Sequence, residues 1–144
     1  MKLPAMGGCI CGAIRYEMTQ EPMMVYACHC TQCQRITSSA FSIGVIVSDT
    51  AFHLTSGVPN VAPGGVADSG RVKRRWVCPD CGTWLFGDPR PGTEWPGMFR
   101  VVRGGTLDDT SWLRPTGHYW TRSKQPWIAL PDDVMQFATQ PDQR

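Results

Sequence analysis

The chain has 144 residues, of which 42% are hydrophobic and 18% charged, and its formal net charge is +2. This length fits one domain with an ordinary core. The balance of apolar and charged residues argues against a disordered chain and against a surface that binds nucleic acid through its charge. The chain also holds fifteen glycines and twelve prolines, which favour short strands over long helices. We therefore expect a mainly β protein with little helix, folded as a single domain over residues 1–144.

The N-terminal stretch MKLPAMGGC has one lysine and no apolar segment of the kind found in export signals. The longest apolar run, AFSIGVIV, is far shorter than the roughly 18 residues that a membrane-spanning helix needs. We expect a soluble, cytoplasmic protein with no membrane partner. No feature of the sequence sets an oligomeric state.

The expected elements follow from apolar patterning and from turn residues. In the stretch that begins at residue 8, Ile14 and Tyr16 should face the core, with Arg15 and Glu17 on the other side. The run AFSIGVIVS is apolar and β-branched, which is typical of a buried strand. The expected strands are, in chain order, 8–18 (entered through a turn), 40–48, 51–57, 71–78, 98–104, 117–121 and 126–130.

Glycine and proline predict loops at 62–70 and 87–97. Only the stretch TQCQRITSSAF, residues 31–41, has room for a helical turn. Residues 138–144 resemble a frayed tail, which leaves a core of about 7–137.

The seven cysteines are the unusual feature of the composition. In a reducing compartment, closely spaced cysteines bind metal more often than they form disulfides. Short spacings let one turn direct two sulfurs at an ion about 2.3 Å away. The groups are Cys9-x-Cys11, Cys28-x-Cys30-x-x-Cys33 and Cys78-x-x-Cys81. Two closed four-cysteine sites would need eight sulfurs, so the simplest partition joins the two pairs and leaves the triplet to bind a second ion.

The joined pairs predict a closed site that contributes folding energy. The stretch CPDCG, residues 78–82, resembles a zinc knuckle, in which Pro79 and Gly82 shape a tight turn. Joining it to CICG, residues 9–12, would connect the N-terminal hairpin to a distant part of the chain.

The triplet offers three ligands, and three protein ligands with one open position are the pattern of a catalytic zinc. A thiolate is the natural fourth ligand for an all-sulfur site. Binding would lower the pKa of that thiol and hold its sulfur for attack on an electrophilic carbon. Alternatively, His53 or His118 closes the site as a second structural zinc, whereas His29 should point away because it lies between two ligands. Redox thiol chemistry and an iron–sulfur cluster are further alternatives, but known clusters take four ligands.

Several stretches together resemble one protein family. They are GGCICGAIRYE, CHCTQCQRITSSAF, WVCPDCGTWLF, VRGGTLDD and GHYWTRSKQPWIAL, which cover residues 7–137. In this order they are similar to the glutathione-dependent formaldehyde-activating enzyme family, also called centromere-protein-V-like. The resemblance implies a β-tent of short antiparallel sheets organised around two zinc ions per chain. It also implies carbon–sulfur lyase chemistry, in which formaldehyde and glutathione give S-hydroxymethylglutathione.

The resemblance further implies a role for each cysteine. Cys9, Cys11, Cys78 and Cys81 match the structural zinc ligands of the family, and Cys28, Cys30 and Cys33 match its catalytic zinc ligands. The chain departs from the family at Ser38, where members often have glycine before SAF. The alternative function is a non-catalytic zinc module, either a glutathione carrier or a scaffold that binds protein or nucleic acid.

Three other features have two interpretations each. Arg35, two residues after Cys33, is a candidate for binding an anionic thiol substrate, or else a surface residue. The basic stretch 71–75 could bind carboxylates or nucleic acid, but a solvated or guarded strand edge is the favoured interpretation. Asp108 and Asp109 could act as a general base, but adjacent aspartates favour a turn.

Overall fold

The structure is a computed structural model that describes residues 1–66, 72–88, 90–91 and 97–140. The single α-helix in this part of the chain, α1, spans Thr31–Thr37, and three short 3-10 turns lie at Asp49–Ala51, Gly104–Thr106 and Thr121–Ser123. The remaining elements are strands, so the expected mainly β fold is confirmed. The strands are β1 (Ala5–Gly8), β2 (Arg15–Met18), β3 (Met24–Cys28), β4 (Ser42–Ser48), β5 (Phe52–Ser56), β6 (Asn60–Val66), β7 (Val72–Val77), β8 (Trp84–Gly87), β9 (Arg90–Pro91), β10 (Met98–Arg103), β11 (Gly117–Tyr119) and β12 (Met135–Phe137).

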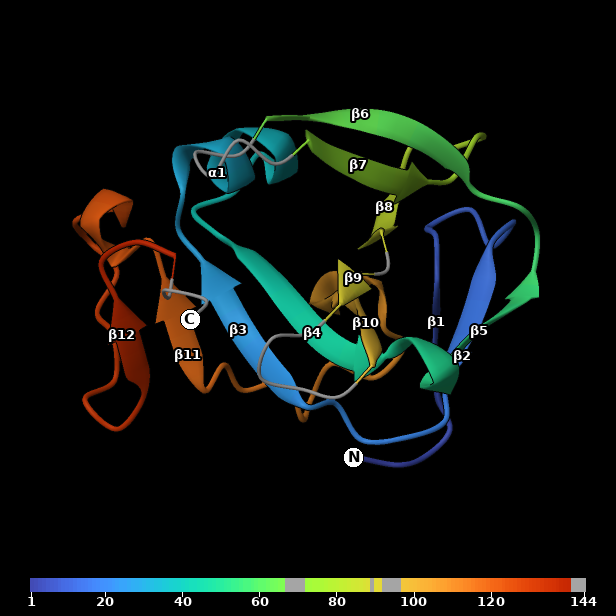
Figure 1. The fold of residues 1–144 in the computed structure, drawn as a ribbon, viewed down its shortest axis with the longest axis horizontal. Coiled ribbons are helices and arrows are strands. Elements are labelled where there is room, and N and C mark those ends of the chain that lie inside the picture. The colour runs from blue at the N-terminus through green and yellow to red at the C-terminus, as the bar shows by residue number, and fades with distance from the viewer. Residues whose placement is uncertain (67–71, 89, 92–96, 141–144) are drawn as a thin grey trace.

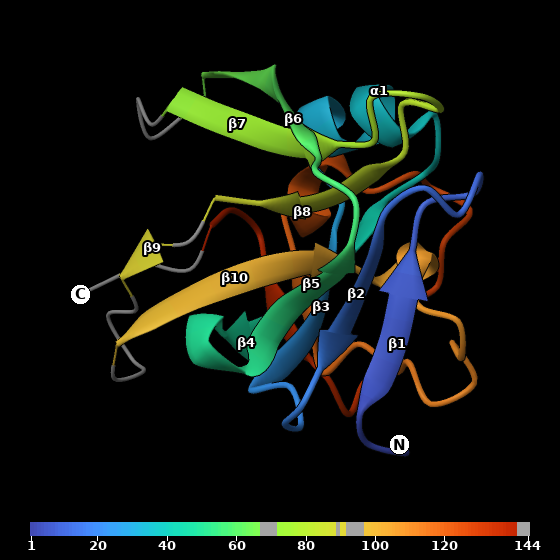
Figure 2. The ribbon, with the colours of Figure 1, turned by 90° about the vertical axis from the view of Figure 1, so that its right-hand side faces the viewer.

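The strands form two sheets. One has three strands in the order β1-β2-β5, and the other has nine, in the order β12-β11-β3-β4-β10-β8-β7-β6 with β9 paired to β10. Most neighbours are antiparallel, but β11 runs parallel to both β3 and β12. Figure 1 shows the three-stranded sheet at one side of the molecule and β11 and β12 at the other, with β3 and β4 between them. Figure 2 shows β10 between β4 and β8.

The main core lies where the three-stranded sheet meets the larger one. The expected alternation of β2 is confirmed: Ile14 and Tyr16 are buried, whereas Arg15 and Glu17 are half-exposed. Strand β4 is covered on both faces, which explains its unbroken apolar run. The main cluster includes Ile14, Tyr16, Met18, Val45, Val47, Phe52, Leu85, Phe86 and Val102, and a smaller cluster holds Ile46, Phe99 and Val101.

Two predictions were wrong in this fold. Residues 126–130 are not a strand, because 126–127 form a turn in which Ile128 N donates to Gln125 O at 3.1 Å and 128–130 are irregular. The last strand is β12, further along the chain. Residues 62–66, predicted as loop, belong to β6. Its glycines and Pro63 lie where the register with β7 shifts, between Pro63 and Val66. An edge strand such as β6 tolerates proline because it needs no N–H donor on its outer side.

The other predicted loop, 87–97, contains the short strand β9, while its residues 89 and 92–96 lie outside the described part of the chain. The same holds for 67–70 of the first loop and for 141–144 of the predicted tail. No helix within the described residues has the length and hydropathy that crossing a bilayer requires.

Candidate functional site

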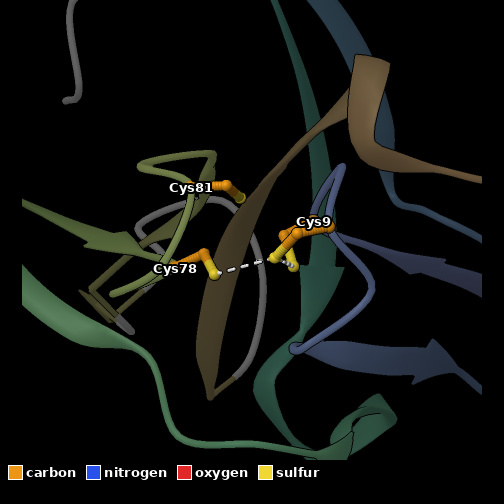
Figure 3. A group of neighbouring side chains, drawn as sticks. Cys9, Cys78 and Cys81 are labelled. Atoms are coloured by element: carbon orange, nitrogen blue, oxygen red, sulfur yellow. Dashed lines mark hydrogen bonds between the residues drawn. The ribbon is translucent and has the colours of Figure 1, made fainter.

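The two cysteine pairs come together although 67 residues separate Cys11 from Cys78. One pair lies in the loop between β1 and β2, and the other in the turn between β7 and β8. Figure 3 shows Cys78 and Cys81 on this turn facing Cys9 across a small gap. All four sulfurs lie within 4.8 Å of one another.

The sulfur spacings fit a metal ion. Sγ of Cys11 lies 3.4 Å from that of Cys9 and 3.7 Å from that of Cys78. Four sulfurs arranged tetrahedrally about 2.3 Å from a zinc ion are about 3.8 Å apart. A disulfide would need a separation of about 2.05 Å, and all seven cysteines are free thiols. The four sulfurs could therefore hold one ion.

A glycine closes each of the two turns that carry these cysteines. Gly12 N donates to Cys9 O at 3.0 Å, and Gly82 N donates to Cys78 O at 3.0 Å. Both glycines have positive φ, 79° and 74° respectively, which glycine adopts without steric cost. The predicted role of Gly82 in a tight turn is confirmed, and Gly12 closes the turn of the N-terminal pair, which is one residue shorter.

The electrostatics of this group also call for a cation. Hydrogen bonds with Thr83 lower the pKa of Cys81 to about 6. A backbone hydrogen bond at Ala13 lowers the pKa of Cys11, but the neighbouring cysteine sulfurs outweigh it and raise this pKa to about 12. Four thiols this close cannot ionise together unless positive charge lies among them, and a divalent metal supplies that charge.

The triplet forms the second group. Cys28 ends β3, Cys30 precedes α1, and Cys33 lies in the first turn of α1, so the predicted helical turn is confirmed. Cys30 is the N-cap: its sulfur accepts a hydrogen bond from Cys33 N at 3.3 Å. The three sulfurs lie within 4.8 Å of one another and could hold a metal ion. Figure 1 shows α1 beyond the ends of β3 and β4, which places the triplet at the ends of these interior strands of the larger sheet.

The thiols of the triplet influence one another strongly. The Cys28 and Cys30 thiols, helped by Ser42 and the charge of Arg103, hold the pKa of Cys33 well below its ordinary value. The Cys30 and Cys33 sulfurs, together with burial, raise the pKa of Cys28. As in the first group, the sulfurs share a charge that they cannot all carry alone.

The histidines lie apart from both groups. His29 is fully buried, and its Nε2 lies 2.9 Å from Nδ1 of His118, also buried. His53 is exposed on β5, in the other sheet. Among the described residues, the group at the triplet holds cysteines alone. The alternative in which a histidine closes the triplet is therefore wrong for this structure.

The comparisons with known proteins address the same features. The sequence model of the glutathione-dependent formaldehyde-activating enzyme family matches residues 4–123. The chain belongs to this family. A protein of Penicillium rubens is 29% identical over 109 residues, covering 74% of this chain and 55% of the relative. A protein of Emericella nidulans is 25% identical over 79 residues, covering 55% of this chain and 39% of the relative. Both relatives carry "glutathione-dependent formaldehyde-activating enzyme" as a provisional name.

The chain thus spans about half the length, or less, of these curated relatives. Among solved structures, a Rhodobacter sphaeroides protein shares the fold, with a TM-score of 0.52 and 19% sequence identity. The similarity covers 76% of this chain and 91% of the Rhodobacter chain.

Ser38, the residue before SAF, ends α1 in the left-handed region with φ 51° and ψ 37°. This conformation is the one that glycine supplies at a helix C-terminus. A serine in this conformation is strained, so a strained residue ends the helix that carries Cys33.

Beside α1 lies a hollow of about 610 Å³. Arg35 lines it, and the side chain of Trp127, 75% exposed, forms part of its rim. Residues two positions apart in an α-helix point about 200° apart around its axis. Arg35 follows Cys33 by two positions and therefore lies on the side of α1 away from it. The other lining residues are Thr31, Gln34, Ser38, Ser39, Ala40 and Gln125.

A hydrogen-bond network supports the loop between Cys28 and Cys30. The carbonyl of His29 accepts from Gln34 Nε2 at 2.7 Å and from Ser123 Oγ at 3.0 Å. Gln34 also accepts from Gln125 Nε2 at 2.8 Å. No sequence signal indicated this network, because it joins α1 to a turn about 90 residues later.

The remaining charged candidates have structural partners. Asp109 accepts hydrogen bonds from the backbone N and Oγ of Ser111, so the favoured turn is confirmed. Asp108 forms an ion pair with Arg15. In the basic stretch, Arg74 pairs with Asp88 at 2.7 Å. These contacts are those of a solvated strand and turn.

Proposed function

We propose that the protein is a zinc-dependent enzyme of the carbon–sulfur lyase type. Its substrates would be glutathione, or a similar thiol, and a small aldehyde, with S-hydroxymethylglutathione as the product. The observation that carries the proposal is the convergence of Cys28, Cys30 and Cys33 into a group that no histidine of the described residues completes. The names of the curated relatives support the same substrate pair.

We assign two zinc ions to each chain. Cys9, Cys11, Cys78 and Cys81 would hold the structural ion, since their spacings suit a closed tetrahedral site. Cys28, Cys30 and Cys33 would hold the catalytic ion. When bound there, zinc would supply the positive charge that keeps a substrate thiol ionised at neutral pH.

The proposed reaction forms one carbon–sulfur bond. The substrate thiol first releases its proton to water. The thiolate then donates an electron pair to the carbonyl carbon of the aldehyde, the carbonyl π electrons move to oxygen, and that oxygen takes a proton from water, so that no net proton is gained or lost. The reverse reaction breaks the same bond and releases aldehyde and thiol. The chain would orient the thiolate beside the triplet and restrict water around it, since the triplet lies partly buried at the end of β3.

Arg35 is the proposed contact for a distant carboxylate of glutathione, because it lines the hollow beside the helix that carries Cys33. Seven free thiols and a glutathione-dependent reaction both suit a reducing compartment, so we place the protein in the cytoplasm.

The test is the rate at which ¹³C-formaldehyde and glutathione exchange with S-hydroxymethylglutathione, measured by NMR. We expect the zinc-loaded protein to accelerate exchange above the spontaneous rate and Cys30→Ser to abolish this acceleration. Glutathione binding without any acceleration would instead support the non-catalytic carrier. If the protein neither binds glutathione nor accelerates exchange, the proposed substrate is wrong.

A further inference from the structure

Three buried polar side-chain atoms form no hydrogen bond of ordinary geometry within the part of the chain that the structure describes. They are Nδ1 of His29, Oγ of Ser42 and Nε of Arg103. Proteins satisfy nearly all such atoms, and each exception calls for an explanation such as an absent ligand. The His29 ring lies against His118, which pairs with Ala27 and so faces away from Cys28. Ser42, in contrast, is the direct cross-strand partner of Cys28, so its unsatisfied hydroxyl lies beside the triplet.

The sheet register places Arg103 at the same ends of the strands. On β4, Ser42 pairs with Cys28 of β3, and Gly44 pairs with Arg103 of β10. Directly paired residues of antiparallel strands share a face, as do residues two apart on one strand. The side chains of Cys28, Ser42 and Arg103 therefore project from one face of the larger sheet, at the end where α1 lies.

Arg103 is held in place. Its guanidinium carbon lies 4.2 Å from the centre of the Trp84 ring, and its carbonyl accepts a hydrogen bond from Thr106 Oγ1 at 2.7 Å. Arginine stays charged at all physiological pH values. Within the described ranges it forms no ion pair, unlike Arg15, Arg74, Arg100 and Arg114. A fixed cation with an unsatisfied N–H donor is suited to an anion that arrives from outside.

The charge at the triplet indicates which anion Arg103 would bind. Three thiolates around a divalent ion carry one net negative charge, and a fourth thiolate would raise this to two. A nearby fixed cation reduces the cost of adding that charge in a partly buried site. We propose that Arg103 is a positioning residue for the sulfur of the thiol substrate, with Ser42 as a second donor. This inference rests on the proposed function and assigns the residues that select the ionised form of the substrate.

The test compares two ligands by calorimetry on the zinc-loaded protein: glutathione and S-methylglutathione, which cannot form a thiolate. We expect Arg103→Met to weaken glutathione binding roughly ten- to hundredfold, because a hydrogen bond to a charged group is lost. S-methylglutathione binding should be the same in both proteins. The pH at which glutathione binding reaches half its maximum should move upward in the variant. Ser42→Ala should cause a smaller loss in the same direction.

Arg103→Lys keeps the charge and provides a folded variant if Arg103→Met is unstable; it should retain part of the affinity for glutathione. Arg114→Met and Ser48→Ala are the matched controls and should bind as the wild type does. An equal loss of both ligands in Arg103→Met, or no loss of glutathione, overturns the proposal. If the wild type binds 2-mercaptoethanol but not glutathione, the proposed substrate is wrong, and the role of Arg103 is then decided by 2-mercaptoethanol affinity.

Discussion

Nε2 of His29 lies 2.9 Å from Nδ1 of His118, and both rings are buried. The bond connects the loop that carries Cys28 and Cys30 to β11, 89 residues further along the chain. The backbone reinforces this connection, since His29 N donates to Tyr119 O at 2.9 Å. The pair thus fixes the triplet loop against the parallel strand beside β3.

The first prediction concerns the charge of His29. Burial, the neighbouring His118 and Lys124 lower its pKa from 6.5 to about 4. The unfolded chain therefore binds this proton more readily than the folded protein. The contribution of the neutral ring to stability is complete above about pH 6.5 and declines as the pH falls toward 4. NMR titration of the His29 ring should show the neutral form down to about pH 5, and a midpoint at 6.5 or above would contradict this.

The second prediction concerns the hydrogen bond itself. His118→Phe leaves Nε2 of the buried His29 without a partner, which should lower the free energy of unfolding by about 1–3 kcal/mol. Chemical denaturation with zinc present measures this change in the free energy of unfolding. His53→Phe is the control, because His53 is exposed on β5, and it should change stability by less than about 0.5 kcal/mol. Equal effects of the two substitutions would show that the pair contributes nothing specific.

The third prediction separates the two cysteine groups. In Cys30→Ser, serine removes a soft ligand but keeps an acceptor at the N-cap of α1, where serine is favoured. We expect this variant to lose one of two zinc ions and stay folded. Cys81→Ser removes a ligand from the group that joins β1–β2 to β7–β8, and we expect it to unfold or to lose most of its stability. Metal analysis and circular dichroism measure both, and equal unfolding would contradict the assignment of an open site.

The sequence was sufficient to partition the cysteines because their chemistry depends on short spacings, which the chain displays directly. The Cys-x-Cys turn and the Cys-x-x-Cys turn each form locally. Because seven sulfurs cannot make two four-cysteine sites, counting them then restricts which groups can share one ion. Half of the twelve strands in the described residues were predictable for a similar reason. Strands β2 and β4, for example, show their burial in the pattern of apolar residues.

The remainder depends on contacts between distant segments. The position of Arg103 beside the triplet follows from the pairing of β10 with β4, and nothing near residue 103 indicates it. Strand β12 has only three residues and exists through its pairing with β11. Glycine and proline at 63–65 suggested a loop, although β7 holds these residues in an edge strand.

The fourth prediction tests the strain at Ser38. Its φ of 51° lies in the left-handed region, which costs a non-glycine residue about 1 kcal/mol. Ser38→Gly should therefore raise the free energy of unfolding by up to about 1 kcal/mol, reduced by the greater freedom of glycine in the unfolded chain. Urea denaturation measures the change. Ser39→Gly is the control, because Ser39 does not have positive φ, and it should be neutral or destabilising. Destabilisation by Ser38→Gly would show that the serine side chain makes a compensating contact.

The fifth prediction concerns Arg35, which faces the hollow beside α1 and lies on the side of the helix away from Cys33. Its charge can therefore reach a distant carboxylate of a long ligand but not the sulfur held at the triplet. Arg35→Ala should weaken glutathione binding only a few-fold, as expected for an exposed ion pair, and leave 2-mercaptoethanol binding unchanged. Added salt should reduce the difference between wild type and variant. Calorimetry at two salt concentrations measures these effects. Equal loss of both thiols would place Arg35 near the sulfur, and no loss of glutathione would make it a surface residue without a role in binding.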